Sequence, residues 1–116
     1  MKKIILLLIT IFILLSMTQY AGAYQTISGT LEKGTCKKDF SIDGVTVFFG
    51  PYRYTKSTIA LFDYDGDGDI ETIYKELVGL VGEEVSLGGW YKDTDFFNVF
   101  TINGLLYRET GPPPWT

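Results

Sequence analysis

Apolar and polar residues alternate along most of the chain beyond residue 24, which is typical of strands that bury one face. In the first segment Ile27, Gly29 and Leu31 share a face. Asp43-Gly44 and Asn103-Gly104 favour two-residue hairpins, because both central positions of such turns need positive φ. The pattern predicts a mainly β chain, with strands at residues 26–33, 40–42, 45–49, 57–62, 85–91, 96–102 and 105–109.

One stretch in the middle of the chain has the period of a helix instead. Its apolar residues recur at three- and four-residue spacings, namely Ile70, Ile73, Tyr74, Leu77, Val78 and Val81. Asp69 suits the N-cap and Glu71 the first turn, where a negative charge is favourable. Gly79 and Gly82 mark the end. We therefore expect a single helix between residues 70 and 81.

The element order, three β segments, a helix and two β segments, resembles that of the OB-fold, in which the helix lies between the third and fourth strands. The stretch from Gly82 to Trp90, Gly-Glu-Glu-Val-Ser-Leu-Gly-Gly-Trp, is similar to phrases common in OB-fold strands. The resemblance covers about residues 26–109 and implies a small OB-fold-like β-barrel with one helix. An SH3-like barrel and an α+β sandwich are the alternatives.

The first 23 residues have the pattern of a secretory signal peptide. Two lysines precede an apolar run at residues 4–15, and Ala21-Gly22-Ala23 fits a cleavage site. The alternative is an uncleaved N-terminal anchor, since the uncharged stretch is about long enough to span a bilayer. We expect a protein that is secreted or exposed on an extracytoplasmic surface, and that contacts the membrane only if this segment is retained.

Residues 24–110 would then form the barrel domain, followed by a proline-rich tail at 111–116. Without Lys2 and Lys3, eight basic residues face fourteen acidic ones, a net charge of about −6. Such a charge disfavours nucleic acid as a partner. Cys36 is the only cysteine, so the chain has no intrachain disulfide. Histidine is absent, which removes the usual general base, and we expect no enzyme.

The chemistry of the chain is concentrated in residues 63–71, Asp-Tyr-Asp-Gly-Asp-Gly-Asp-Ile-Glu. Carboxylates recur at every second position, and a Ca²⁺ ion needs six to eight oxygens around one point. The order Asp-x-Asp-x-Asp-Gly resembles the opening of calcium loops in EF-hands and dockerins. The resemblance implies Ca²⁺ ligands at Asp63, Asp65, Asp67, Asp69 and Glu71.

The acidic run also departs from the EF-hand. Tyr74 stands at loop position twelve, where an EF-hand has a bidentate Glu, and no helix is expected before the loop. A shorter loop closed by Glu71 therefore matches better, and Glu76 is a reserve ligand. Mg²⁺ and a solvated acidic turn are the alternatives to Ca²⁺.

Aromatic residues are dense, and Tyr52, Tyr54 and Trp90 lie near expected turns. They could form a face that stacks on an oligosaccharide or a peptide, whereas packing within the barrel is the alternative. We expect a noncatalytic domain with a structural Ca²⁺ ion, whose partner is a protein or a carbohydrate. A metal-dependent hydrolase is a further alternative, although no Lys or Arg lies in the acidic run.

Overall fold

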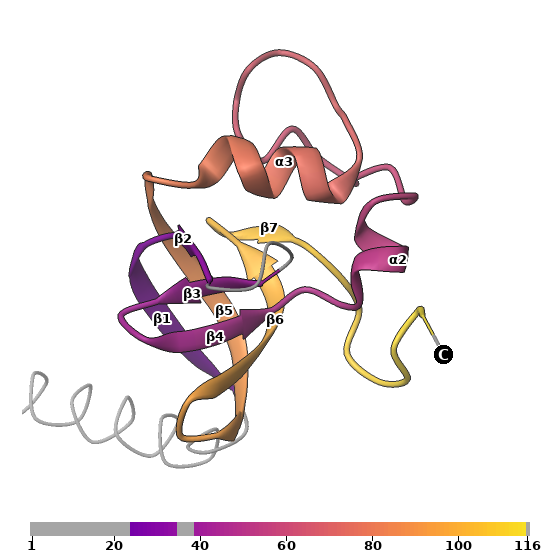
Figure 1. The fold of residues 1–116 in the computed structure, drawn as a ribbon. Coiled ribbons are helices and arrows are strands. Elements are labelled where there is room, and N and C mark those ends of the chain that lie inside the picture. The colour runs from indigo at the N-terminus through magenta and orange to yellow at the C-terminus, as the bar shows by residue number, and fades with distance from the viewer. Residues whose placement is uncertain (1–23, 35–38, 116) are drawn as a thin grey trace, which may run out of the picture.

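The computed structural model describes residues 24–34 and 39–115 (Figure 1). The expected signal peptide, Cys36 and the last residue of the tail lie outside these ranges. No helix in the described part is both long and apolar enough to cross a membrane. Its elements are β1 (Gln25–Thr30), β2 (Glu32–Lys33), β3 (Phe40–Ile42), β4 (Val45–Phe48), α2 (Tyr52–Thr55), α3 (Ile73–Leu80), β5 (Glu84–Asp93), β6 (Phe96–Ile102) and β7 (Leu105–Leu106).

The strands form one strongly curled sheet in the order β1-β5-β6-β4-β3-β2, and β7 pairs with β6. The two ends of this order, β1 and β2, are separated in the chain by Leu31 alone, so one bent strand contributes to both ends of the sheet. β4 and β6 run parallel, which requires a crossover connection; α2, α3 and β5 lie within it. The prediction of a mainly β, small-barrel fold is confirmed.

Both predicted hairpin turns are present. Asp43 and Gly44 have φ of 50° and 80°, and Asn103 and Gly104 have φ of 50° and 81°. Positive φ at both central residues is the requirement of a type I′ turn, whose twist matches that of the flanking strands. These turns set the register of β3 against β4 and of β6 against β7.

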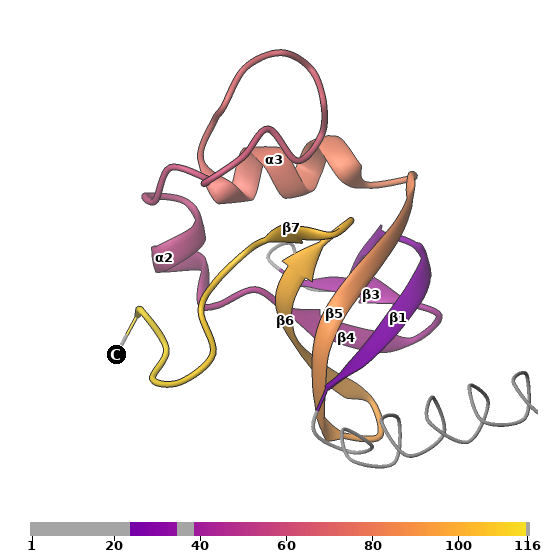
Figure 2. The same cartoon turned by 180° about the vertical axis from the view of Figure 1, so that it is seen from behind.

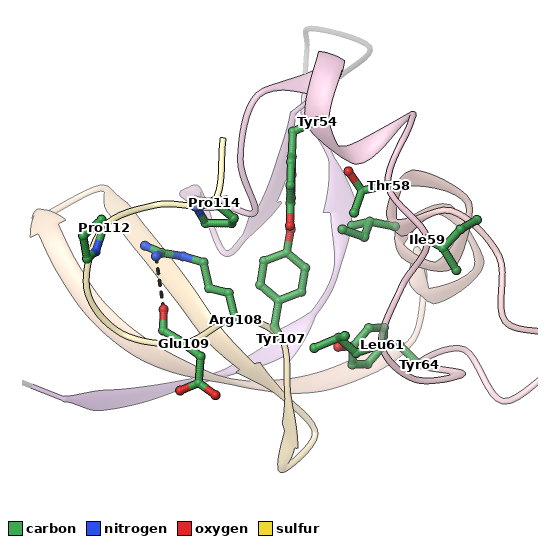
Figure 3. Close-up of a pocket in the computed structure, with 11 residues that line it drawn as sticks. Tyr54, Thr58, Ile59, Leu61, Tyr64, Tyr107, Arg108, Glu109, Pro112 and Pro114 are labelled. Carbon is green, nitrogen blue, oxygen red and sulfur yellow. Dashed lines mark hydrogen bonds between the residues drawn. The ribbon is translucent and has the colours of Figure 1, made fainter. Parts of the chain in front are cut away.

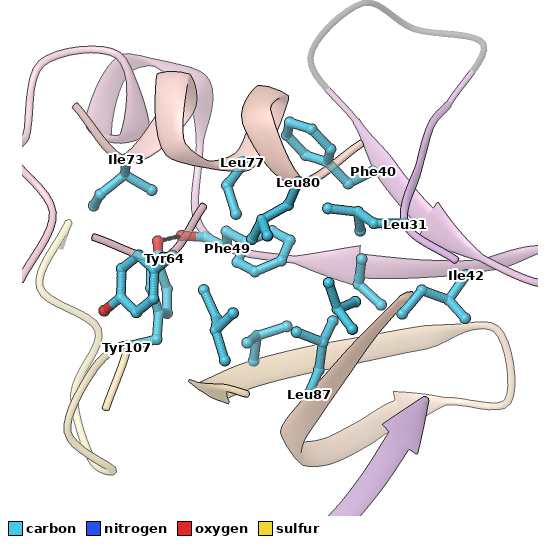
Figure 4. Packing of buried hydrophobic residues seen from close by; sticks show 14 of the residues in the cluster. Leu31, Phe40, Ile42, Phe49, Tyr64, Ile73, Leu77, Leu80, Leu87 and Tyr107 are labelled. Atoms are coloured by element: carbon cyan, nitrogen blue, oxygen red, sulfur yellow. Dashed lines mark hydrogen bonds between the residues drawn. The ribbon is translucent and has the colours of Figure 1, made fainter. Parts of the chain in front are cut away.

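The hydrophobic core lies between the inner face of the curled sheet and α3, which covers one end of it (Figures 2 and 4). Ile73, Leu77 and Leu80 are the buried apolar residues of this helix. Across from them, β5 and β6 alternate buried and more exposed residues, as expected for strands with one face inward. Val85 and Leu87, in the stretch that resembles OB-fold strands, are both buried.

Two features of the predicted helix are wrong. It begins at Ile73 rather than near Ile70, and Thr72 is its N-cap, with a side chain that accepts a hydrogen bond from the Lys75 N–H. Ile70 and Val78 are exposed, whereas Leu80, which falls outside the predicted stripe, is buried. The N-cap at Thr72 therefore sets the start of the helix, although the helical spacing of apolar residues extends back to Ile70.

The strand predicted at residues 57–62 is also wrong. This segment contributes only an isolated bridge between Ile59 and Thr72, and Ile59, Leu61 and Phe62 are exposed. Two backbone hydrogen bonds, Ala60 N–H to Glu71 and Ile73 N–H to Thr58, hold it against the start of α3 instead of a barrel strand. The one-turn helix α2 was not predicted.

Candidate metal centre

The acidic loop rises over the side of α3 that faces away from the barrel (Figures 1 and 2). Its curl comes from Gly66 and Gly68, with φ of 69° and 94°. Carboxylates inside the loop hold the curl, because Asp63 Oδ2 accepts from the Gly68 N–H at 2.8 Å and Asp65 Oδ1 from the Asp67 N–H at 3.3 Å. The side chains are thereby turned inward, towards one another.

Glu76 reaches this loop from α3. Its side chain is fully buried, at 0% exposure, and both of its oxygens accept backbone hydrogen bonds. Oε1 accepts from the Asp65 N–H at 3.1 Å and Oε2 from the Glu71 N–H at 2.9 Å. One carboxylate thus joins the beginning and the end of the loop to the helix. A buried carboxylate with two neutral donors and no cation still pays a desolvation cost.

Four carboxylates converge at this place, from Asp63, Asp65, Asp67 and Glu76. Each contributes one oxygen, and all four oxygens lie within 4.8 Å of one another. Two full negative charges at that distance repel by about 0.9 kcal/mol in water and by about 3.5 kcal/mol at an effective dielectric constant of 20. The arrangement is therefore unfavourable without a cation or bound protons.

Asp63 provides an observation that is independent of the convergence. Its Oδ1 atom is buried and has no hydrogen-bond partner among the residues that the structure describes. Buried carboxylate oxygens are almost always satisfied, so an orphaned one needs an explanation, and coordination of a cation would provide it. The other oxygen of the same side chain accepts a hydrogen bond from the Gly68 N–H, so the carboxylate is held in this orientation.

The pKa values around the loop respond to this crowding. Burial raises the pKa of Asp65 to about 7, and the nearby carboxyl groups of Asp63, Glu76 and Asp67 act in the same direction. Contact with the Asp67 carboxyl raises the pKa of Glu71. The pKa of Asp63 is lowered, chiefly by the hydrogen bond from the Gly68 N–H. The loop thus holds a mixture of ionised and protonated acids unless a cation compensates them.

The structure brings together three of the five predicted metal ligands, Asp63, Asp65 and Asp67. Asp69 is exposed and only its N–H takes part in the loop, donating to Asp67 Oδ1 at 2.9 Å. Glu71 contacts Asp67 but is not one of the four converging groups. Glu76, the reserve ligand, is the fourth member.

The donor set fits a hard divalent cation. All four groups are carboxylates, and Ca²⁺ and Mg²⁺ both prefer oxygen ligands of this kind. Ca²⁺–oxygen distances are about 2.3–2.6 Å, so two oxygens on opposite sides of one ion are about 4.6–5.2 Å apart. Oxygens no more than 4.8 Å apart are compatible with that sphere.

The three aromatic residues predicted to form a stacking face do not line one hollow. Tyr54 lines a pocket beside the C-terminal tail, and Tyr52 lines a different one next to β4. Trp90 lines neither of these two and packs on Phe100, with ring centroids 4.6 Å apart.

Comparison with known proteins gives no match for this chain: no family model, no curated protein and no solved structure is significantly similar.

Proposed function

We propose that this protein is a noncatalytic, extracytoplasmic β-barrel domain that binds Ca²⁺ through Asp63, Asp65, Asp67 and Glu76. The observation that carries the proposal is the buried, unpartnered Asp63 Oδ1 at the point where four carboxylates converge. A cation there would be coordinated by that oxygen and would neutralise the repulsion between the carboxylates. The extracytoplasmic location is inferred from the pattern of residues 1–23.

The role of the ion would be structural. Glu76 belongs to α3, which packs on the core, whereas the other three ligands belong to the loop. An ion shared between them would fasten the loop to the folded domain. By mass action it would stabilise the domain by about 1.4–2.7 kcal/mol when free Ca²⁺ exceeds the dissociation constant ten- to hundredfold. We expect a dissociation constant on the order of 10⁻⁵ to 10⁻³ M, as in extracellular modules.

The first experiment is a thermal melt of the purified protein in EDTA, in about millimolar Ca²⁺ and in Mg²⁺. We expect a rise of several degrees in Ca²⁺ and a smaller one in Mg²⁺. Asp63→Asn should abolish the rise, because it removes one negative charge and places an amide in the cage. Asp43→Asn is the matched control, since Asp43 is an exposed turn residue outside the cluster.

Two outcomes would count against the proposal. Equal melting temperatures in EDTA and Ca²⁺, together with no calorimetric heat of Ca²⁺ binding, would reduce the loop to an acidic turn. An equal loss in Asp63→Asn and Asp43→Asn would show that the response reflects overall charge and not a site.

A further inference from the structure

A second site is suggested on the side of the molecule where the C-terminal tail folds back. A cavity of about 250 Å³ lies between this tail, the end of α2 and the segment that leads into the acidic loop (Figure 3). Its walls include Tyr54, Ile59, Leu61, Tyr64, Tyr107 and Arg108. None of the four carboxylates of the candidate metal centre lines it.

Arg108 is the notable member of this wall. It is only 9% exposed, which is rare for an arginine that has no carboxylate partner among the described residues. The guanidinium carbon lies 4.2 Å from the Phe100 ring centroid and 5.0 Å from that of Trp115. The guanidinium donates a long hydrogen bond of 3.4 Å, from Nη1 to the Glu109 carbonyl oxygen. These contacts fix its plane, and within the described residues this long bond is the one hydrogen bond that its five N–H donors make.

No carboxylate compensates this charge among residues 24–34 and 39–115. Burial lowers the pKa of Arg108, and the groups that oppose this effect are the phenols of Tyr107 and Tyr54, not an Asp or Glu. Glu109 also lines the cavity, but its carboxylate points away from the guanidinium (Figure 3). A buried cation without an anion is costly, and an anion that enters the cavity would remove that cost.

Apart from Thr58, Glu109 and the tyrosine hydroxyls, the remaining wall is apolar, and the tail that forms part of it is held in place. Trp115 packs against Phe48 and Tyr54, with ring centroids 5.6 and 5.3 Å away, so the tail is seated on the barrel. Gly50 permits this seat, because a Cβ at that position would lie 2.8 Å from the Trp115 ring. Ile59 and Leu61 face the other side of the cavity, and both are largely exposed to solvent. The cavity therefore exists before any ligand arrives.

We propose that this cavity binds a small carboxylate that carries a compact apolar group, such as an arylacetate or the C-terminal residue of a peptide. The carboxylate would pair with the Arg108 guanidinium, whose fork matches its two oxygens. The apolar group would cover Ile59 and Leu61. A phosphate group is disfavoured because Arg108 is the only cation among the described residues that line the cavity.

The test is a two-dimensional NMR titration of the intact protein with phenylacetate, and with its neutral isostere phenylacetamide. We expect saturable shifts with phenylacetate at residues around the cavity, and at least about tenfold weaker binding of the amide, since the charge-assisted hydrogen bonds are lost. A titration with N-acetyl-leucyl-phenylalanine distinguishes the two sources of the ligand. Tighter binding of this peptide identifies a peptide C-terminus, and tighter binding of phenylacetate identifies a free acid.

Two variants locate the site. Arg108→Gln should weaken phenylacetate binding about tenfold or more, whereas Arg53→Gln, at an exposed position of α2, should leave it unchanged. Arg108 also stacks on Phe100 and Trp115, so its replacement can affect stability as well as binding. A second variant tests the cavity without disturbing the core, because Ile59 is 62% exposed and can be changed to Ser. Ile59→Ser should weaken phenylacetate binding several-fold and leave the melting temperature unaltered.

The proposal is overturned if acid and amide bind equally, if neither acid nor peptide binds saturably, or if the shifts map away from Arg108 and Ile59. The titrations are run in EDTA and again in Ca²⁺. Binding of phenylacetate in either condition supports the cavity whether or not the metal centre binds an ion.

Discussion

Gly79 of α3 and Asp65 of the acidic loop are in direct contact: a Cβ atom added to Gly79 would lie 2.1 Å from Asp65 Oδ2 and 2.9 Å from Asp65 Cβ. The absence of a side chain at Gly79 therefore lets the loop lie against the helix. Gly79 was expected to end the helix, but α3 continues through it to Leu80. Gly79 therefore permits the close approach of Asp65 to the helix and does not terminate the helix.

Gly79→Ala tests this contact. Alanine favours a helix over glycine by about 1 kcal/mol, so the substitution would stabilise α3 if nothing touched it. We expect instead that the methyl group displaces Asp65 and weakens Ca²⁺ binding about tenfold or more, as measured by calorimetric titration. Val78→Ala, at an exposed neighbouring position, should leave the affinity nearly unchanged. Unaltered affinity in Gly79→Ala would show that Asp65 is not a ligand.

The raised pKa of Asp65, about 7, makes Ca²⁺ binding dependent on pH. Binding requires the ionised carboxylate, so below pH 7 the ion must displace a proton and the affinity falls, by up to about tenfold per pH unit. We expect weaker binding at pH 6 than at pH 8, with proton release detectable by calorimetry in two buffers of different ionisation enthalpy. Constant affinity over this range, with no proton release, would contradict the prediction.

The same shift gives the metal-free protein the opposite dependence. The folded pKa of Asp65 lies above its ordinary value of 3.8, so the stabilising contribution of the bound proton is complete below 3.8 and is lost as pH rises through 7. In EDTA the melting temperature should therefore fall between about pH 4 and pH 7. Asp65→Asn should reduce this fall, and Asp43→Asn should not.

Sequence alone can identify the loop but not its closing ligand. Alternating carboxylates and the glycine after Asp67 are local features, and they predicted three of the four converging groups. Glu76 lies beyond the acidic run, and its participation depends on where the helix begins. A start at Ile73 with Thr72 as cap places Glu76 in the first turn, beneath the loop. A start near residue 70 would instead place Glu71 in the first turn.

Sequence patterns are local signals, which explains both why the barrel strands could be predicted and why the strand at 57–62 was predicted wrongly. Hairpin dipeptides and alternating strands carry their signal within a few residues, so the barrel segments were identified closely. The apolar residues Ile59 and Leu61 have a strand-like pattern, but this segment makes only the Ile59–Thr72 bridge at the start of α3 and does not join the sheet. They line the cavity beside Arg108 instead. The alternation of apolar residues alone cannot distinguish such a segment from a strand.

Tyr64 links the acidic loop to β7, because its hydroxyl donates a hydrogen bond of 2.5 Å to the Leu106 carbonyl oxygen. Tyr64→Phe should lower the free energy of unfolding by about 1 kcal/mol at neutral pH, since the carbonyl loses a partner. Burial raises the Tyr64 pKa from 10.0 to about 12. This neutral phenol therefore contributes stability that is complete below pH 10.0 and is lost as pH rises to 12, up to about 3 kcal/mol.

Denaturant unfolding at a series of alkaline pH values checks this prediction. The native protein should lose its advantage of about 1 kcal/mol over Tyr64→Phe as pH rises above 10, and should be the less stable of the two by pH 12, because phenylalanine cannot ionise. Tyr107, whose pKa is raised chiefly by burial, is present in both proteins, so the effect of its burial is common to them. A constant difference across this range would show that Tyr64 is not buried as a neutral phenol.

Substitution by alanine should have very different effects on stability at two glycines of the barrel, Gly89 and Gly44. At Gly89 of β5 an added Cβ would lie 1.8 Å from the Asn98 carbonyl oxygen of β6, a backbone atom that cannot move without parting the two strands. At Gly44 nothing lies within 4 Å, and the only cost is the left-handed φ of 80°. Gly44→Ala should therefore lower the free energy of unfolding by about 1–2 kcal/mol. Gly89→Ala should prevent folding, as judged by the loss of a cooperative denaturant transition and of the dispersion of amide NMR signals. Similar, small losses in both variants would mean that β5 and β6 are not packed at this point as closely as the structure shows.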